Sequence, residues 1–249
     1  IRSVTHWRIL VQPIESLEGK RVALVGLGIS QVDFAVGLEN GKTWDEVWTI
    51  NSAAAVYKTD RMFMLDPASR FFDSNDAGKQ TSALTRILPE ADYPIYTCEL
   101  DDRVPSAVVY PIEDVCNATR CAYLNNTVAY AIAFALFNKV GAIDLYGIDF
   151  SYKENMHFAE AGRACVEFWI CKCMEADITV GISSRSTVLD SNVVATDRLY
   201  GFHRLDKPLV AVPHEGKWII GPFEDIDEKL QEHGLVLHKD EEPPEPYKG

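Results

Sequence analysis

The stretch YGIDFSYKENMHF, residues 146–158, places several ionisable side chains close together in the middle of the chain. Asp149, Tyr152 and His157 lie between an apolar run typical of a strand and a segment with helical periodicity. A histidine just before a helix feels the positive end of the helix dipole, which favours the neutral imidazole that a general base needs. This position also suits an N-terminal cap or an ordinary polar residue, so His157 is a candidate base with structural alternatives.

Other kinds of catalytic site find less support in the residue pattern. The six cysteines, at positions 98, 116, 121, 165, 171 and 173, do not have zinc-site spacing, and no second His or Cys lies at metal spacing from His157. Ser30 and Ser183 lack the GxSxG context of a serine hydrolase, and the chain contains no GxxxxGK[ST] motif. We therefore expect reduced structural thiols, no bound metal and no resident cofactor.

The candidate residues require elements that position them, and the hydrophobic pattern predicts an alternation of strands and helices. Strand-like apolar runs occupy 22–26, 46–50, 60–66, 93–98, 142–150 and 177–181. Helical patterns follow Ser30, which we predict to be an N-cap, and recur at 76–88, 126–140 and 158–175. This order predicts an α/β fold, a Rossmann-like and mostly parallel sheet with helices on both faces.

In open parallel sheets, ligands bind beyond the carboxyl ends of the strands. Five stretches follow predicted strands and are expected to gather several polar groups along that edge. They are Gly26-Leu-Gly28-Ile-Ser30, Asn51-Ser52, Asp66, Gly147-Ile148-Asp149 with Tyr152 and His157, and Ser183-Ser-Arg185-Ser186. Each has a structural alternative, such as a tight turn without a ligand at the first stretch or a capped turn at Asp66.

The glycine turn after the first strand could bring backbone N–H groups close to a phosphate or sugar. A dinucleotide site would need a third glycine where Gln31 stands and an acidic residue where Asn51 ends the second strand. Both departures argue against NAD, so NAD-dependent redox chemistry ranks last among the functions that we consider.

Composition and charge bound the rest of the chain. The net charge of −13 gives no general attraction to nucleic acids or anionic membranes, and no apolar run approaches the ~20 residues of a membrane helix. We predict a Rossmann-like domain over 1–195, a C-terminal extension over 196–238 that packs on it and contains a hairpin around His214-Glu215-Gly216, and an acidic, Pro-rich tail over 239–249. We expect a cytoplasmic protein without a membrane span. The sequence does not decide whether it forms a homo-oligomer.

Several motifs, taken in order, resemble the bacterial sialyltransferases of glycosyltransferase family 42. They are VALVGLGIS, the strand ending in Asn51, LNNTVAYAIAFALFNKVGAIDLYGIDF, and His157 followed by Glu167-Phe168. The resemblance covers residues 20 to about 190. A broader resemblance extends to archaeal 6-hydroxymethylpterin diphosphokinases, which share the Rossmann-like core.

This resemblance implies a CMP-sugar donor, direct displacement without a metal, and His157 as the general base. Tyr152, one position away from the family's tyrosines, could assist the departing phosphate, and Asp149, a further catalytic candidate, would line the nucleotide end of the site with Gly147 and Ile148. The nucleotide would be held by Gly26, Gly28, Ser30, Asn51, Asn126, Thr127, Gly147 and Ile148. Asp66, Arg70, Arg185 and Ser186 are candidate substrate contacts, and Arg70, Arg163 and Arg185 could form a basic cleft.

The chain also departs from this family. Leu27 stands where the family's GNGPS turn has an Asn, and only six residues, SYKENM, separate GIDF from His157. In the sialyltransferases this loop is far longer and forms a lid, so residues 67–90 or 195–240 would have to cover the site here.

The leading hypothesis is a metal-independent glycosyltransferase that uses CMP- or another nucleotide-sugar. Its acceptor would be a glycan, a small metabolite or a hydroxylated DNA base. Two alternatives stay open: an ATP-dependent pyrophosphokinase with Mg²⁺ on Asp66 and Asp149, and a nucleotide-binding module without catalysis.

Overall fold

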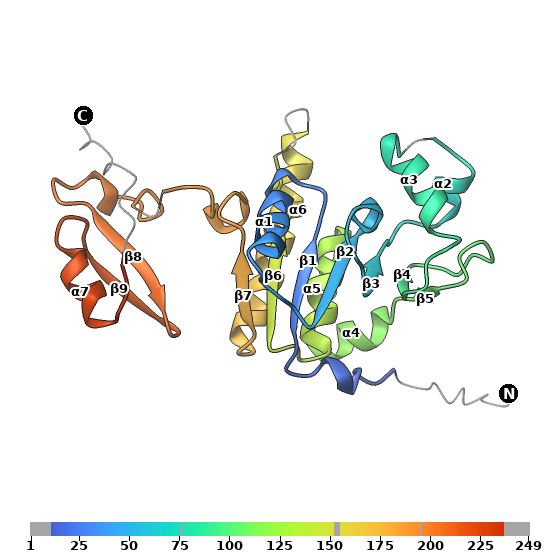
Figure 1. The fold of residues 1–249 in the computed structure, drawn as a ribbon, viewed down its shortest axis with the longest axis horizontal. Helices are drawn as coiled ribbons and strands as arrows, with labels where there is room; N and C mark the ends of the chain where they lie inside the picture. Colours follow the sequence, from blue (N-terminus) through green and yellow to red (C-terminus); the bar gives the residue numbers. More distant parts are fainter. Residues whose placement is uncertain (1–10, 76, 152–154, 195, 237–249) are drawn as a thin grey trace, which may run out of the picture. The chain divides into compact units, whose positions relative to one another are not determined.

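A computed structural model describes residues 11–75, 77–151, 155–194 and 196–236. The chain divides into two compact units, residues 1–189 and 190–249, so the division falls after Leu189. The first unit is built on one seven-stranded sheet (Figure 1). Its strands are β1 Arg21–Val25, β2 Glu46–Ile50, β3 Arg61–Phe63, β4 Ile95–Thr97, β5 Ala107–Val109, β6 Ala142–Tyr146 and β7 Thr179–Ile182.

All six strand pairs of this sheet are parallel, and the strand order is β5-β4-β3-β2-β1-β6-β7. In register, Val25 at the end of β1 lies opposite Thr49 of β2 and Tyr146 of β6. The first five strands therefore run outward from β1 to one edge, and β6 returns to the other side of β1. The predicted Rossmann-like α/β fold is confirmed.

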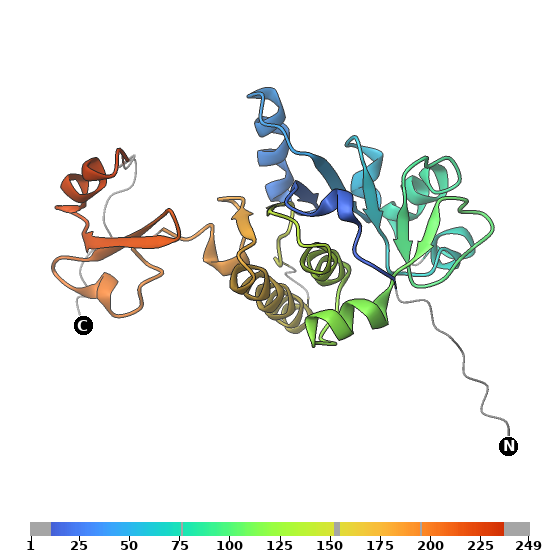
Figure 2. The same ribbon diagram turned by 90° about the horizontal axis from the view of Figure 1, so that it is seen from below.

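Helices cover both faces of the sheet, and strand β1 shows the reason in its apolar run. Val22 and Leu24 join the large core cluster that includes residues of α5 (Thr127–Phe137) and α6 (Met156–Glu175), whereas Ala23 and Val25 pack with Phe34 of α1 (Val32–Glu39). Successive side chains of a strand point to opposite faces, so a strand covered on both sides is apolar throughout. Figure 2 shows α1, in blue, on one side of the strands and α5 and α6 on the other.

Three further helices complete the first unit. They are α2 Ser69–Phe72, α3 Lys79–Ile87 and α4 Ile112–Thr119. Leu84 and Leu88 pack with Met62 and Ile95 in a second cluster beside β3 and β4. The predicted helix at 76–88 corresponds to α3, whereas β5, α2 and α4 were not predicted because their segments are short.

Two predicted helix starts were wrong. Ser30 lies inside the 3₁₀ helix η2 (Ile29–Gln31) and does not cap α1, because its hydroxyl accepts the Gly147 N–H at 2.8 Å. His157 lies in the first turn of α6 rather than before it. The cap of α6 is Asn155, whose side chain accepts the Phe158 N–H.

The second unit contains the predicted hairpin. Strands β8 (Leu209–His214) and β9 (Lys217–Pro222) pair antiparallel, and both loop residues, Glu215 and Gly216, have positive φ, of 48° and 74°. Positive φ at both positions suits the right-handed twist of the strands. Helix α7 (Ile226–Glu232) covers one face of the hairpin through Ile226 and Leu230, which cluster with Val210.

The predicted packing of this extension on the first domain stays a prediction. The acidic tail at 239–249 lies outside the described residues. Within the described part of the chain, no helix has both the length and the apolar character that crossing a membrane requires.

Candidate functional site

Strands β1 and β6 form the switch point of this sheet. From β1 the chain turns through α1 on one face, and it reaches β6 through α5 on the other face. Because the helices that connect these strands lie on opposite faces of the sheet, a crevice opens at the carboxyl ends of β1 and β6. Doubly wound sheets bind their ligands in such a crevice.

A cavity of about 740 Å³ lies at this place. It extends along the carboxyl ends of four adjacent strands, β3, β2, β1 and β6. Neighbouring strands are about 4.8 Å apart, so the cavity follows roughly 14 Å of sheet edge. Its lining residues include Gly26, Leu27, Gly28, Ile50, Asn51, Asp66, Arg70, Gln80, Asn125, Asn126, Thr127, Val128, Gly147, Ile148, Asp149, Phe150, Ser151, Phe158, Ala161 and Gly162.

The two glycine turns, after β1 and after β6, pack against each other. Gly26 and Gly28 donate N–H bonds of 2.8 Å to the carbonyls of Tyr146 and Gly147. A Cβ on Gly26 would lie 2.5 Å from the Gly147 carbonyl oxygen, and a Cβ on Gly147 would lie 2.5 Å from the Gly26 oxygen. These glycines are therefore needed for contact between two loops, and the same loops form the floor of the cavity.

Asp149 joins these turns and also faces the cavity. Its Oδ2 accepts the Ser30 N–H at 2.8 Å, and a Cβ on Gly28 would overlap the same carboxylate. Its Oδ1 is buried and accepts no hydrogen bond from the described residues. Ser30 itself is fully buried and does not line the cavity, because its hydroxyl is used inside the loop pair.

Two carboxamides present further buried acceptors to the cavity. Asn51 begins the 3₁₀ helix η3 (Asn51–Ala55) in the left-handed region, with φ 48°, and its Oδ1 has no partner among the described residues. Strained backbone of this kind collects at functional sites, although Asn tolerates it better than most residues. The Gln80 side chain comes from the first turn of α3. Its Oε1 is also buried without a hydrogen-bond partner among the described residues.

Sequence reasoning missed Gln80. The residue lies inside a helix, away from the strand ends at which ligand-binding groups were sought, and no motif marks it. Only the packing of α3 beside η3 brings its side chain to this cavity.

The N-terminus of α5 forms another wall. The Asn126 Oδ1 caps the Ala129 N–H at 3.0 Å, and its Nδ2 donates to the Asn125 side chain and the Gly162 carbonyl. Asn126 is thus a helix cap that lines the cavity rather than a group with unused hydrogen-bonding atoms. Thr127 and Val128 also line the cavity in the first turn, where N–H groups lack partners within a helix and favour anions.

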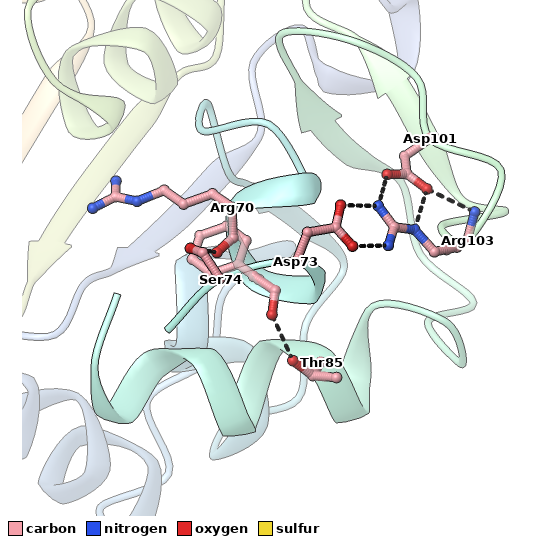
Figure 3. Close-up of polar contacts among 7 residues, drawn as sticks. Arg70, Asp73, Ser74, Thr85, Asp101 and Arg103 are labelled. Atoms are coloured by element: carbon pink, nitrogen blue, oxygen red, sulfur yellow. Dashed lines mark hydrogen bonds and ion pairs between the residues drawn. The ribbon is translucent and has the colours of Figure 1, made fainter. Parts of the chain in front are cut away.

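The far wall carries an ion pair between Asp66 and Arg70, with the Oδ1 and Nη1 atoms 2.6 Å apart. Beyond it, Arg103 bridges Asp73 and Asp101 at 2.7 Å each and lies over the Phe72 ring. Figure 3 shows the Arg70 guanidinium pointing away from this Asp73–Arg103–Asp101 cluster. Hydrogen bonds from Arg103 lower the pKa of Asp101 to about 2 and lower that of Asp73. The cluster ties the end of α2 to the β4–β5 loop.

Besides Ser30, four predicted site residues lie away from the cavity or outside the described residues. His157 is exposed on α6 and is not among the cavity residues, although its neighbour Phe158 is. Tyr152 lies outside the described residues. Arg185 pairs with Asp33 at 2.8 Å, and the buried Ser186 hydroxyl donates to the Ile148 carbonyl at 2.6 Å.

The predicted basic cleft does not form at this cavity. Of the three arginines, only Arg70 lines it, while Arg163 pairs with Glu167 at 2.7 Å. In the described ranges, no group of three or more His, Cys, Asp or Glu side chains is arranged to hold a metal ion.

The fold and the cavity define an α/β protein with a cavity at the switch point of a parallel sheet, the candidate ligand site. No protein-family model matches the chain, and no curated protein sequence is significantly similar to it. Among solved structures, the chain is similar to the sialyltransferase CstII from Campylobacter jejuni in complex with CMP-3FNeuAc. That similarity has 17% identity and a TM-score of 0.44, over 70% of this chain and 84% of that chain.

Two more solved structures show a similar degree of likeness. One is CstII in complex with cytidine-5'-monophosphate, at 17% identity and a TM-score of 0.40, over 66% of this chain and 79% of that one. The other is an apo α-2,3-sialyltransferase from Campylobacter jejuni, at 14% identity and a TM-score of 0.38, over 69% and 79%.

Proposed function

We propose that the chain is a glycosyltransferase that uses a nucleotide-sugar donor. The observation that carries this proposal is the shape and chemistry of one cavity. It begins at the paired glycine turns of the switch point and continues along four strand ends, and Asn51 and Asp149 present buried acceptors without partners to it. A buried acceptor without a partner costs about 1–3 kcal/mol, which a ligand with hydroxyl groups would recover.

Both halves of a nucleotide-sugar fit this description, because ribose and sugar hydroxyls donate hydrogen bonds. The phosphates would find N–H donors at the N-terminus of α5. The order of the sequence motifs, which resembles that of family 42 sialyltransferases, supports the same assignment and makes a CMP-sugar the first donor to test.

The proposed reaction is a direct displacement without a metal ion. The acceptor oxygen attacks the anomeric carbon, the bond from that carbon to the phosphate oxygen breaks, and His157 takes the hydroxyl proton. His157 is a candidate because it precedes Phe158, which lines the cavity. Tyr152 is the candidate hydrogen-bond donor to the departing phosphate. The acceptor would be a glycan, a small metabolite or a hydroxylated DNA base.

Thermal unfolding against CMP, UDP, GDP, ADP and ATP, with and without Mg²⁺, tests the donor class. A nucleotide at 100 times its Kd adds about 2.7 kcal/mol to the free energy of unfolding. Stabilisation by CMP or another nucleotide without Mg²⁺ is expected. Stabilisation by ATP only with Mg²⁺ would instead support a pyrophosphokinase, and no stabilisation by any nucleotide would refute the proposal.

The role of His157 needs a separate assay. Once a donor is known, release of free nucleotide from the nucleotide-sugar in the presence of candidate acceptors measures transfer. His157→Gln is expected to lower kcat by about 10²–10⁴-fold and to leave donor affinity unchanged. His233→Gln, in the second unit, is the matched control and should have no effect. Full activity in His157→Gln would exclude this residue as the base, and donor binding without any transfer would indicate a binding module.

A further inference from the structure

Gln80 is a partly buried residue whose amide oxygen is buried without a partner among the described residues. It lies in the first turn of α3, lines the cavity, and has its Oε1 enclosed without a hydrogen bond from the described residues. A glutamine amide carries one acceptor oxygen and two N–H donors. Buried polar atoms almost always have partners, so such an oxygen at a cavity wall points to a ligand group that is absent from the structure.

A second buried oxygen without a partner, that of Asn51, belongs to the element that packs beside α3. Helix α3 packs beside η3, and Ala54 of η3 contacts the cluster that contains Leu84 and Leu88. η3 begins at Asn51, whose Oδ1 is also buried without a partner among the described residues. Two carboxamides from adjacent elements therefore present acceptors to the same cavity.

Gln80 lies toward the β3 side of the cavity, and the glycine turns lie toward its β6 side. The turns follow β1 and β6, whereas Asp66 follows β3, two strand positions from β1 and three from β6, or roughly 10–14 Å. Figure 1 shows α3, which carries Gln80, on the side of β3 that faces away from β6. If the nucleotide binds at the glycine turns, the group that it carries extends toward Gln80.

We propose that Gln80 is a specificity-determining residue that recognises the transferred sugar by accepting a hydrogen bond from it. The Asp66 carboxylate at this side of the cavity is paired with Arg70, so the Gln80 oxygen is the acceptor left for a hydroxyl or amide N–H group of the sugar. The sugar therefore presents hydroxyl or amide groups to α3. This inference rests on the proposed function and adds to it the residue that recognises the transferred sugar.

The test compares a nucleotide with its nucleotide-sugar on the full chain. Calorimetric titrations use three pairs: CMP with CMP-3FNeuAc, UDP with UDP-glucose, and GDP with GDP-mannose. Gln80→Met keeps the length of the side chain but removes its hydrogen-bonding groups. It should weaken binding of the recognised nucleotide-sugar about 10-fold and leave the nucleotide alone within about 2-fold. Lys79→Met, next to it on the exposed side of α3, is the matched control and should change neither affinity.

A second variant keeps the test valid if Gln80→Met folds poorly. Gln80→Glu keeps an acceptor oxygen and replaces the amide NH₂ with a second one, and it places an acidic residue in the first turn of α3, which the helix dipole favours. It should bind a nucleotide-sugar whose sugar is uncharged within about 3-fold of the wild type, because the accepted hydrogen bond survives.

The outcomes separate this inference from the proposed function. Equal weakening of nucleotide and nucleotide-sugar by Gln80→Met would place the residue at the nucleotide and overturn the inference, as would unchanged binding of both. If the wild type binds none of the six compounds, the proposed function itself fails. Selective loss of nucleotide-sugar affinity in Gln80→Met, with Lys79→Met unchanged, establishes the inference.

Discussion

Replacing Gly28 with alanine should disrupt the loop pair on which the cavity rests. The backbone of Gly28, with φ −72° and ψ 166°, is one that alanine adopts easily, so the substitution introduces no backbone strain. The new Cβ would instead overlap the carboxylate of Asp149, with Cγ at 2.7 Å and Cβ at 2.8 Å. Asp149 must move, and it then loses the Ser30 N–H that it accepts at 2.8 Å.

The loss of stability in Gly28→Ala can be estimated in two ways, and both concern the same displacement of the Asp149 side chain. Overpacking a tight site costs about 1–3 kcal/mol, and losing a hydrogen bond to a charged acceptor costs about 1.5–3 kcal/mol. Because a single movement of Asp149 relieves the overlap and breaks the bond, the two costs do not add. We expect Gly28→Ala to lower the free energy of unfolding by about 2–3 kcal/mol, and a domain of this size should then melt roughly 4–12 °C lower.

A double-mutant cycle tests the cause as well as the size. Urea unfolding, followed by the fluorescence of the buried Trp48 and Trp169, is measured for Gly28→Ala, Asp149→Ala and the double variant. Asp149→Ala removes the carboxylate oxygens and Cγ from the overlap but keeps its own Cβ at 2.8 Å from the new methyl group, so Gly28→Ala should cost about 1 kcal/mol less in that background than in the wild type.

A matched glycine provides the control for this cycle. Gly37 lies inside α1 and a Cβ there would meet Trp44 at an ordinary 3.4 Å, so Gly37→Ala should stabilise the chain by about 0.5–1 kcal/mol. Equal costs of Gly28→Ala with and without Asp149 would refute the reasoning, because the overlap would then not be the cause.

Three further predictions concern stability and binding. Asn51→Gly keeps the left-handed backbone and removes the buried carboxamide, so thermal melting should shift by less than about 1 kcal/mol while calorimetry shows nucleotide-sugar affinity reduced about 5-fold or more. Asn126→Ala removes the cap of α5 and should cost about 1 kcal/mol, a fall of roughly 2–4 °C in Tm; an unchanged Tm would contradict the capping role. The lowered pKa values of Asp73 and Asp101 contribute stability that is present above their unfolded pKa near 3.8 and is lost as the pH falls toward 2, so Arg103→Met should flatten the acid limb of a stability–pH curve. An unchanged acid limb in that variant would show that the ion pairs add nothing.

The fold could be predicted because its signals are local. The apolar runs at 22–26 and 46–50 correspond closely to β1 and β2, and the alternation with helices specified a parallel sheet. The rule that ligands bind at strand ends then selected Gly26, Asn51 and Gly147, which line one cavity. Helix starts were less predictable, because a serine or histidine near a helix can face several partners.

What the sequence by itself determined was therefore the class of fold and the edge of the sheet at which to search. Only the tertiary structure decided how residues far apart in the chain are used. Ser30 and Asp149 are 119 positions apart, yet their hydrogen bond occupies groups that sequence reasoning had assigned to a nucleotide. Gln80 reaches the cavity only because α3 packs beside η3. Periodicity and turn propensities act over a few residues, whereas these contacts depend on how whole elements pack, which no short stretch of sequence encodes.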